Sequence, residues 1–139
     1  MNAAKKPAPE KGRPLSILLA DDEEDAVVTL AAILEDEGHL VHTVTNGALV
    51  MDAIARFKPE VCIIDIEMPG QSGYALAREI SQAKQPDRPL LIAISGKWKT
   101  QTDRYLAKSV GFEYFFVKPA DPAEVIAALE PLRGPTRAA

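Results

Sequence analysis

The sequence predicts a single α/β domain with a five-stranded parallel sheet and helices on both of its faces. Two patterns indicate this class. Short runs that are apolar or β-branched alternate five times with stretches whose apolar residues recur at helical spacing. Wholly apolar short runs are typical of strands covered on both faces. Strands joined through helices form parallel sheets with right-handed crossovers, so we expect that arrangement.

The five strands are expected at the short runs. Residues 17–20 and 61–64 are wholly apolar, as in buried strands. Residues 41–45 alternate in polarity and include β-branched side chains, which favours a strand. Residues 90–94 and 114–117 complete the set.

The five helices are expected after these strands. The first ends at Gly38, because glycine is favoured just past a helix end. Asn46 is expected to cap the second helix, which stops before Pro59. The last begins at Pro122, with Asp121 as its cap. The stretches with helical spacing are residues 27–34, 50–57, 73–81, 102–109 and 125–132.

Length and composition limit the possible functions. The 139 residues suffice for one domain, and 47% hydrophobic with 26% charged residues is ordinary globular composition. A net charge of -4 argues against a surface that is a nucleic-acid footprint as a whole. Cys62, the single cysteine, excludes an internal disulfide and lies in an apolar run, so we expect it to be buried. Apolar runs are far shorter than the ~20 residues of a membrane span, so we expect a cytoplasmic protein.

Two tails are expected to flank the domain. Residues 1–14 hold three prolines and several charges without an apolar period, which is typical of a disordered tail. Residues 133–139 are similar, which leaves residues 15–132 as the folded domain. Neither tail is long enough to form an output domain.

Polar residues gather where the expected strands end. Asp21 and Asp22 follow the first strand, and Asp65 follows the third. Ser95 follows the fourth and Lys118 the fifth. In open parallel sheets, ligands bind at the carboxyl ends of the strands. If the strand order is 2-1-3-4-5, these groups converge in one crevice. Each has a plain structural explanation alone, such as an aspartate capping the first helix, but together they favour a functional site.

The charges of these groups predict their chemistry. Three neighbouring carboxylates repel one another and need a cation, and oxygen ligands with open positions suit Mg²⁺. A carboxylate can act as the nucleophile on phosphorus and form an acyl phosphate. Mg²⁺, a lysine and a serine hydroxyl would stabilise the transferring phosphoryl group. We therefore expect phosphoryl capture, with slow release because no general base is apparent.

These residues resemble the receiver domain of bacterial response regulators in two-component systems, of the kind found in chemotaxis regulators. The stretch from Asp65 to Gly73 (DIEMPGQSG) fits the family pattern of Asp, two residues, Met-Pro, three residues and Gly. The resemblance covers about residues 15–132 and implies a flavodoxin-like fold with strand order 2-1-3-4-5. The other matches are the acidic pair Asp21 and Asp22, Ser95-Gly96, Phe115, and Lys118-Pro119.

The resemblance implies a role for each site residue. Asp65 would be the phosphoacceptor. Asp22, Asp65 and the backbone carbonyl of Glu67 would hold Mg²⁺, with Asp21 acting through water. The expected catalytic set is Asp65, Lys118, Ser95 and Asp21.

A switch is implied as well. The Ser95 hydroxyl would bond the phosphoryl group while Phe115 turns inward, and Lys118–Pro119 would be a cis peptide. The donor would be a sensor histidine kinase or a phosphotransfer protein. A protein output partner would bind the face of the fourth strand, fourth helix and fifth strand, without nucleic acid or membrane.

Five further residues have open interpretations. Glu67 and Lys97 flank the expected approach of the phosphoryl group, so they either tune the reaction or are solvated loop charges. Trp98 either anchors a partner or folds back over its own loop. His39 and His42 are too few for a metal site and are expected at surface positions.

Two other functions compete with the receiver. A small Mg²⁺-dependent phosphatase of the haloacid-dehalogenase class also uses a strand-end aspartate, and Asp65-Ile66-Glu67 partly imitates its motif. That class places its acidic metal pair after the lysine, whereas Asp21 and Asp22 precede Asp65. A flavin carrier lacks support, because acids stand where a phosphate-binding loop would lie. We therefore expect a regulator and not an enzyme, acting only on its own phosphorylation and dephosphorylation.

Overall fold

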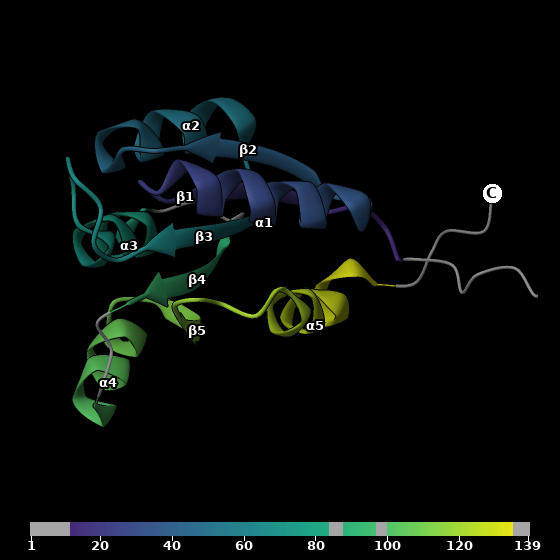
Figure 1. Cartoon of the computed structure of the whole chain (residues 1–139). Helices are drawn as coiled ribbons and strands as arrows, with labels where there is room; N and C mark the ends of the chain where they lie inside the picture. The colour runs from purple at the N-terminus through teal and green to yellow at the C-terminus, as the bar shows by residue number, and fades with distance from the viewer. Residues whose placement is uncertain (1–11, 84–87, 97–99, 135–139) are drawn as a thin grey trace, which may run out of the picture.

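The structure is a computed structural model that describes residues 12–83, 88–96 and 100–134. Its strands form one parallel sheet in the order β2-β1-β3-β4-β5, which confirms the predicted topology (Figure 1). Each strand lies within two residues of its expected position. The strands are β1 (Ser16–Ala20), β2 (Leu40–Val44), β3 (Val61–Asp65), β4 (Leu90–Ser95) and β5 (Phe112–Val117).

Each expected helix is present in the described ranges. Side chains of Ser72, Thr100 and Asp121 accept hydrogen bonds from first-turn N–H groups of the third, fourth and fifth helices. Within those ranges, no helix combines the length and apolar character needed to cross a membrane. The helices are α1 (Glu24–Asp36), α2 (Val50–Phe57), α3 (Gly73–Gln82), α4 (Gln101–Ser109) and α5 (Pro122–Arg133).

The start of α2 differs from the expectation. Asn46 accepts a hydrogen bond from the Ala48 N–H at 2.8 Å, but it caps a short 3-10 turn, η1 (Gly47–Leu49), that precedes α2. Gly47 packs against the loop after β3, where a Cβ atom would collide with the Gln71 carbonyl oxygen. Tertiary contact with that loop therefore determines the tighter turn.

The core has two layers because successive strand residues point to opposite faces of the sheet. Leu18 and Cys62 belong to the layer under α2, α3 and α4, and Cys62 is buried as predicted. Ile17 and Ile63 belong to the layer under α1 and α5. All five residues of β3 are buried, so this central strand fixes where its last residue, Asp65, lies.

The prediction of a surface position for His39 is wrong. His39 is buried, and its Nδ1 atom accepts a hydrogen bond from the Leu15 N–H at 3.0 Å. A backbone donor at the entry to β1 needs an acceptor, and the side chain at the turn before β2 supplies it. His42 is partly exposed on β2 and stacks on Phe57, with ring centroids 3.7 Å apart.

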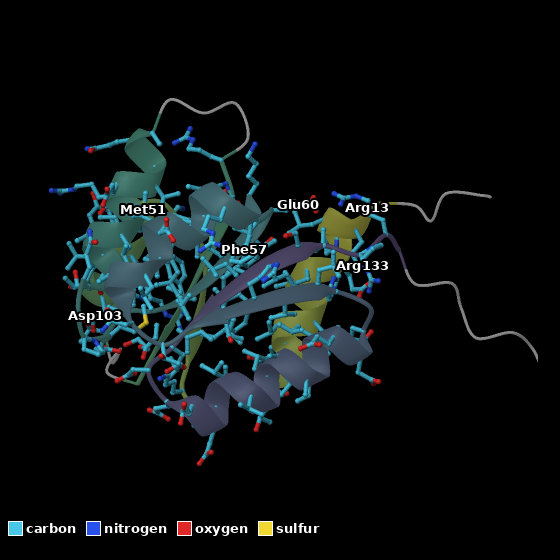
Figure 2. All side chains as sticks on the ribbon, turned by 90° about the horizontal axis from the view of Figure 1, so that it is seen from above. Arg13, Met51, Phe57, Glu60, Asp103 and Arg133 are labelled. Atoms are coloured by element: carbon cyan, nitrogen blue, oxygen red, sulfur yellow. The ribbon has the colours of Figure 1, made fainter. Side chains whose placement is uncertain are left out.

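The expected tail boundaries also need correction. Arg133 belongs to α5 and is only 2% exposed, whereas the sequence predicts that the C-terminal tail begins at this residue. Its guanidinium donates to the carbonyl oxygens of Gly12 (2.8 Å), Arg13 (3.0 Å) and Glu37 (3.1 Å). It also pairs with Glu130 at 3.3 Å. A buried guanidinium needs several acceptors. Two of them are backbone carbonyl oxygens of residues 12 and 13, so Arg133 holds this segment against the domain; Figure 2 shows Arg13 beside Arg133.

Removal of the Arg133 guanidinium should destabilise the fold. We expect Arg133→Ala to lower the free energy of unfolding by about 2–4 kcal/mol, because buried carbonyl oxygens lose their donor and a cavity forms. Urea denaturation measures this. Arg56→Ala is the matched control, since Arg56 is exposed and lies 3.9 Å from Asp52, and should change stability by less than about 0.5 kcal/mol. Equal effects of the two substitutions would contradict the structural role of Arg133.

Candidate functional site

The carboxyl ends of four neighbouring strands meet at one edge of the sheet. Asp21 directly follows β1, Asp65 ends β3 and Ser95 ends β4, while Lys118 directly follows β5. Asp21, Asp65 and Ser95 are 4%, 3% and 0% exposed. The parallel register aligns these strand ends, so the predicted groups converge although up to 97 positions separate them in the chain.

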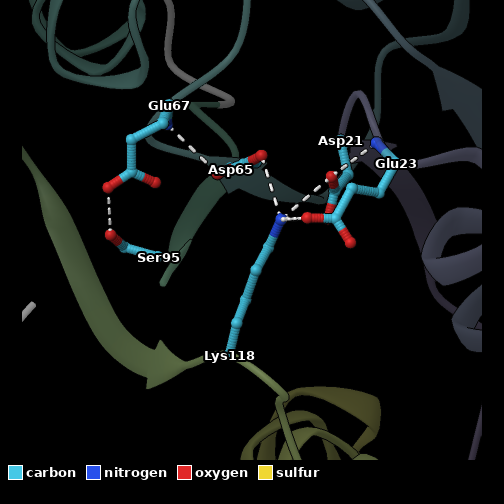
Figure 3. A network of polar contacts seen from close by, with 6 residues as sticks. All are labelled: Asp21, Glu23, Asp65, Glu67, Ser95 and Lys118. Carbon is cyan, nitrogen blue, oxygen red and sulfur yellow. Dashed lines mark hydrogen bonds and ion pairs between the residues drawn. The ribbon is translucent and has the colours of Figure 1, made fainter. Parts of the chain in front are cut away.

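Lys118 lies between two of the predicted carboxylates. Its Nζ atom is 3.1 Å from oxygens of both Asp21 and Asp65 (Figure 3). The Lys118–Pro119 peptide is cis, as predicted. The ammonium group therefore offsets part of the negative charge that the strand ends bring together.

Glu23 is a member of this network that the sequence analysis missed. Its carboxylate lies 3.4 Å from Lys118 Nζ, although its side chain is 66% exposed. The signal was present in the sequence, because Glu23 continues the acidic run of Asp21 and Asp22. A charge at the start of a helix is usually solvated, so this signal alone does not predict a site residue.

A cation site is possible beside Lys118. Carboxylate oxygens of Asp21, Asp22 and Asp65 lie within 4.8 Å of one another, and Asp22 is exposed. This set consists of oxygen donors with an open, solvent-facing side, which fits Mg²⁺ better than a metal that prefers nitrogen or sulfur. The residues present therefore fit the predicted ion.

Burial controls the protonation of Asp65. Removal from water raises the pKa of Asp65 to about 7, and the Asp21 charge acts in the same direction. Hydrogen bonds from Lys118 and from the Glu67 N–H lower that pKa but do not reverse the shift. For Lys118, burial alone would lower the pKa, but hydrogen bonds and charges of Asp21 and Asp65 raise it overall. Lys118 therefore stays an ammonium group, while burial and the Asp21 charge make the ionised form of Asp65 unfavourable.

Ser95 has a carboxylate partner. Its hydroxyl donates a hydrogen bond to the side chain of Glu67, which is partly buried (Figure 3). The Glu67 N–H donates in turn to Asp65 Oδ1 at 3.1 Å. Glu67 therefore contacts both the buried hydroxyl and the buried carboxylate, and it is not a freely solvated loop charge.

Phe115 is the second residue of the predicted switch. Phe115 is partly buried and packs against the layer under α2, α3 and α4. Lys97 and Trp98 lie outside the described residues.

Comparisons with known proteins agree with the fold. The family model of the response regulator receiver domain matches residues 17–130. The protein PilH of Pseudomonas aeruginosa is 30% identical over 105 residues, which cover 76% of this chain and 86% of PilH. The transcriptional regulatory protein CreB of Escherichia coli is 31% identical over 117 residues, which cover 84% of this chain but only 50% of CreB.

Solved structures share the architecture. The signal receiver domain of a DNA-binding response regulator from Colwellia psychrerythraea superposes with a TM-score of 0.79 at 22% identity, covering 85% of this chain and 97% of that one. At this identity, the similarity supports the fold alone.

This chain belongs to the response regulator receiver domain family of two-component signalling. Members of that family are regulatory domains that interact with histidine kinases or phosphotransfer proteins. Family membership leaves the phosphatase and flavin-carrier alternatives without support. The chain spans half the length of CreB, so the activity of a whole regulator does not transfer to it directly.

The raised pKa of Asp65 predicts a pH dependence of stability. The carboxyl has a pKa of about 7 in the folded protein and about 4 when unfolded. Between these values the folded state binds a proton that the unfolded state lacks, so the contribution of Asp65 to stability falls as pH rises. We expect Asp65→Asn to be more stable than wild type at pH 8 without metal, by about 1 kcal/mol or more, and less so at pH 5.

Urea denaturation from pH 5 to 8 in the presence of a chelator measures the difference. Asp52→Asn is the control, because Asp52 is 73% exposed and should show little pH-dependent difference. A stability gain for Asp65→Asn that grows toward pH 5 would have the wrong sign for a raised pKa.

Proposed function

We propose that this chain is a phosphoacceptor receiver, in which a phosphoryl group from a histidine kinase or phosphotransfer protein is transferred to Asp65. The observation that carries the proposal is the position of Asp65. It is a buried carboxylate at the end of the central strand, with Lys118 3.1 Å from one oxygen and the Glu67 N–H 3.1 Å from the other. That arrangement orients a nucleophile and supplies positive charge beside it.

The chemistry is a phosphoryl transfer between side chains. An oxygen of Asp65 attacks the phosphorus of a phosphohistidine, and the new O–P bond forms as the P–N bond breaks. The electron pair of the broken bond returns to the imidazole nitrogen of the donor. Lys118, freed in part from Asp21, stabilises the charge on the phosphoryl oxygens, and the Ser95 hydroxyl donates to one of them.

Mg²⁺ is the proposed cofactor. Asp22, Asp65 and the backbone carbonyl of Glu67 would hold the ion, with Asp21 acting through water. When bound, the ion neutralises negative charge on the carboxylates and on the phosphoryl group. The chain then undergoes phosphorylation and dephosphorylation on its own side chain, and it does not turn over a separate substrate.

The proposed output surface is the face of β4, α4 and β5. Large apolar side chains are exposed there: Tyr105 (73%) and Leu106 (48%) on α4, and Tyr114 (38%) and Val117 (44%) on β5. These are four of the eight large apolar residues exposed in the described part of the chain. Because β5 is the edge strand and packs beside α4, these exposed apolar groups lie on neighbouring elements, and such groups favour a protein partner. Phe115 packs on the side of the sheet that α4 covers, so a change in its burial when Ser95 exchanges partners would alter this surface.

Phosphoryl uptake should require Asp65. We expect wild type to be labelled by acetyl phosphate with Mg²⁺ and Asp65→Asn to take up no detectable label, because an amide is not a nucleophile toward phosphorus at neutral pH. Mass spectrometry of the intact protein gives the measurement. Asp52→Asn should be labelled like wild type, since Asp52 is exposed on α2. Equal labelling of Asp65→Asn and wild type would rule out Asp65 as the acceptor.

Mg²⁺ should stabilise the folded protein through the acidic cluster. A ligand that binds the folded state raises the free energy of unfolding in proportion to the logarithm of its concentration. We expect Asp22→Asn to weaken the apparent Mg²⁺ affinity by at least about tenfold, measured by thermal unfolding over a Mg²⁺ titration. Asp25→Asn, a nearby substitution outside the cluster, should retain the wild-type response. An unchanged response in Asp22→Asn would remove Asp22 from the metal site.

A further inference from the structure

The Ser95 hydroxyl is already engaged in the unphosphorylated protein. Ser95 is 0% exposed, and it donates its hydrogen bond to a side-chain oxygen of Glu67 (Figure 3). A buried hydroxyl without an acceptor is unfavourable, so the carboxylate of Glu67 satisfies a group that has no access to water. In this state, Glu67 is the acceptor at the position where the proposed function requires a phosphoryl oxygen.

One hydroxyl cannot serve both acceptors. A serine side chain carries a single O–H donor, so Ser95 donates either to Glu67 or to a phosphoryl oxygen. Both acceptors are anionic, and hydrogen bonds to ionised acceptors are roughly twice as strong as neutral ones. Phosphorylation therefore has to exchange one strong hydrogen bond for another.

The backbone holds Glu67 in this position. Its N–H donates to Asp65 Oδ1 at 3.1 Å, and the next strand supports the same loop, because the Ile66 N–H donates to the Ile94 carbonyl at 2.9 Å. The Glu67 carboxylate consequently lies at the Ser95 hydroxyl, while the Glu67 N–H contacts the proposed acceptor. An incoming phosphoryl group therefore faces the negative charge of Glu67, and it also has to displace Glu67 from the Ser95 hydroxyl.

We propose that Glu67 is a positioning residue that competes with the phosphoryl group for the Ser95 hydroxyl and so sets the affinity of the site for that group. The proposal rests on the proposed function, because it takes Asp65 as the acceptor. Competition for Ser95 differs in one respect from simple charge repulsion between Glu67 and the phosphoryl group. Repulsion acts whether or not Ser95 carries a hydroxyl, whereas competition disappears without it.

The test uses beryllofluoride with Mg²⁺ as a phosphoryl mimic, and a double-substitution cycle over Glu67 and Ser95. Thermal unfolding over a titration of the mimic measures its binding. We expect Glu67→Ala to tighten binding by about tenfold, equivalent to about 1.4 kcal/mol. In the Ser95→Ala background, the same substitution should change binding by less than about twofold. Glu67→Gln, which keeps an acceptor oxygen without the charge, should lie between wild type and Glu67→Ala.

Glu23→Gln is the matched control for charge. It removes one negative charge near the site, 3.4 Å from Lys118, and its effect should be the same with and without the Ser95 hydroxyl. Equal tightening by Glu67→Ala in both Ser95 backgrounds would replace competition with simple repulsion. No tightening in either background would overturn the proposal. Should Glu67→Ala fail to fold, Glu67→Gln carries the same comparison.

Labelling by acetyl phosphate separates this proposal from the proposed function. If Asp65 is the acceptor, Asp65→Asn abolishes labelling in every Glu67 background, whatever Glu67 does to the affinity. If Asp65→Asn is still labelled, the proposed function has failed. If labelling depends on Asp65 but the Glu67 effect does not depend on Ser95, the competition alone has failed.

Discussion

The crowding of carboxylates around one ammonium group is the constraint on which this structure depends. Asp21 and Asp65 are almost fully buried and share Lys118, whose Nζ atom lies 3.1 Å from each. Burial and mutual repulsion oppose the charged state of Asp65, which raises its pKa to about 7. The domain therefore holds negative charge where folding alone would not place it, and the proposed cation or phosphoryl group would change that balance.

The sheet supplies the rigidity that this arrangement requires. Like charges remain close only if the backbone cannot move to separate them. Every residue of β3 is buried, with β1 and β4 paired on either side, so the backbone that carries Asp65 cannot relax. Far from the site, Arg133 joins the end of α5 to Gly12, Arg13 and Glu37. The sheet is therefore fixed by strand pairing near the site and by Arg133 at the end of α5, and the site residues lie at the ends of its strands.

Besides the opposed effects of burial and charge at Asp65, a second competition involves Glu67. Its backbone N–H helps to orient Asp65, while its carboxylate occupies the Ser95 hydroxyl. The same residue thus supports the proposed acceptor and competes with the group that would be accepted. A receiver built in this way would keep the hydrogen bond between Ser95 and Glu67 until a phosphodonor transfers its group to Asp65. Ser95 would exchange partners only if the phosphoryl oxygen is the better acceptor.

The sequence by itself determined the fold class and the residues at the strand ends, and the resemblance to receiver domains implied the strand order. Those features depend on hydrophobic periodicity and on a motif of adjacent residues, both of which are local and readable along the chain. The burial of His39, the clasp of Arg133 and the hydrogen bond between Glu67 and Ser95 were decided only by the tertiary structure. Each joins side chains to groups that lie far away in sequence: 24 positions for His39, 28 for Glu67 and up to 121 for Arg133. A polar residue looks alike in sequence whether it meets water or a buried partner, and only the packing of the chain determines which of the two it meets.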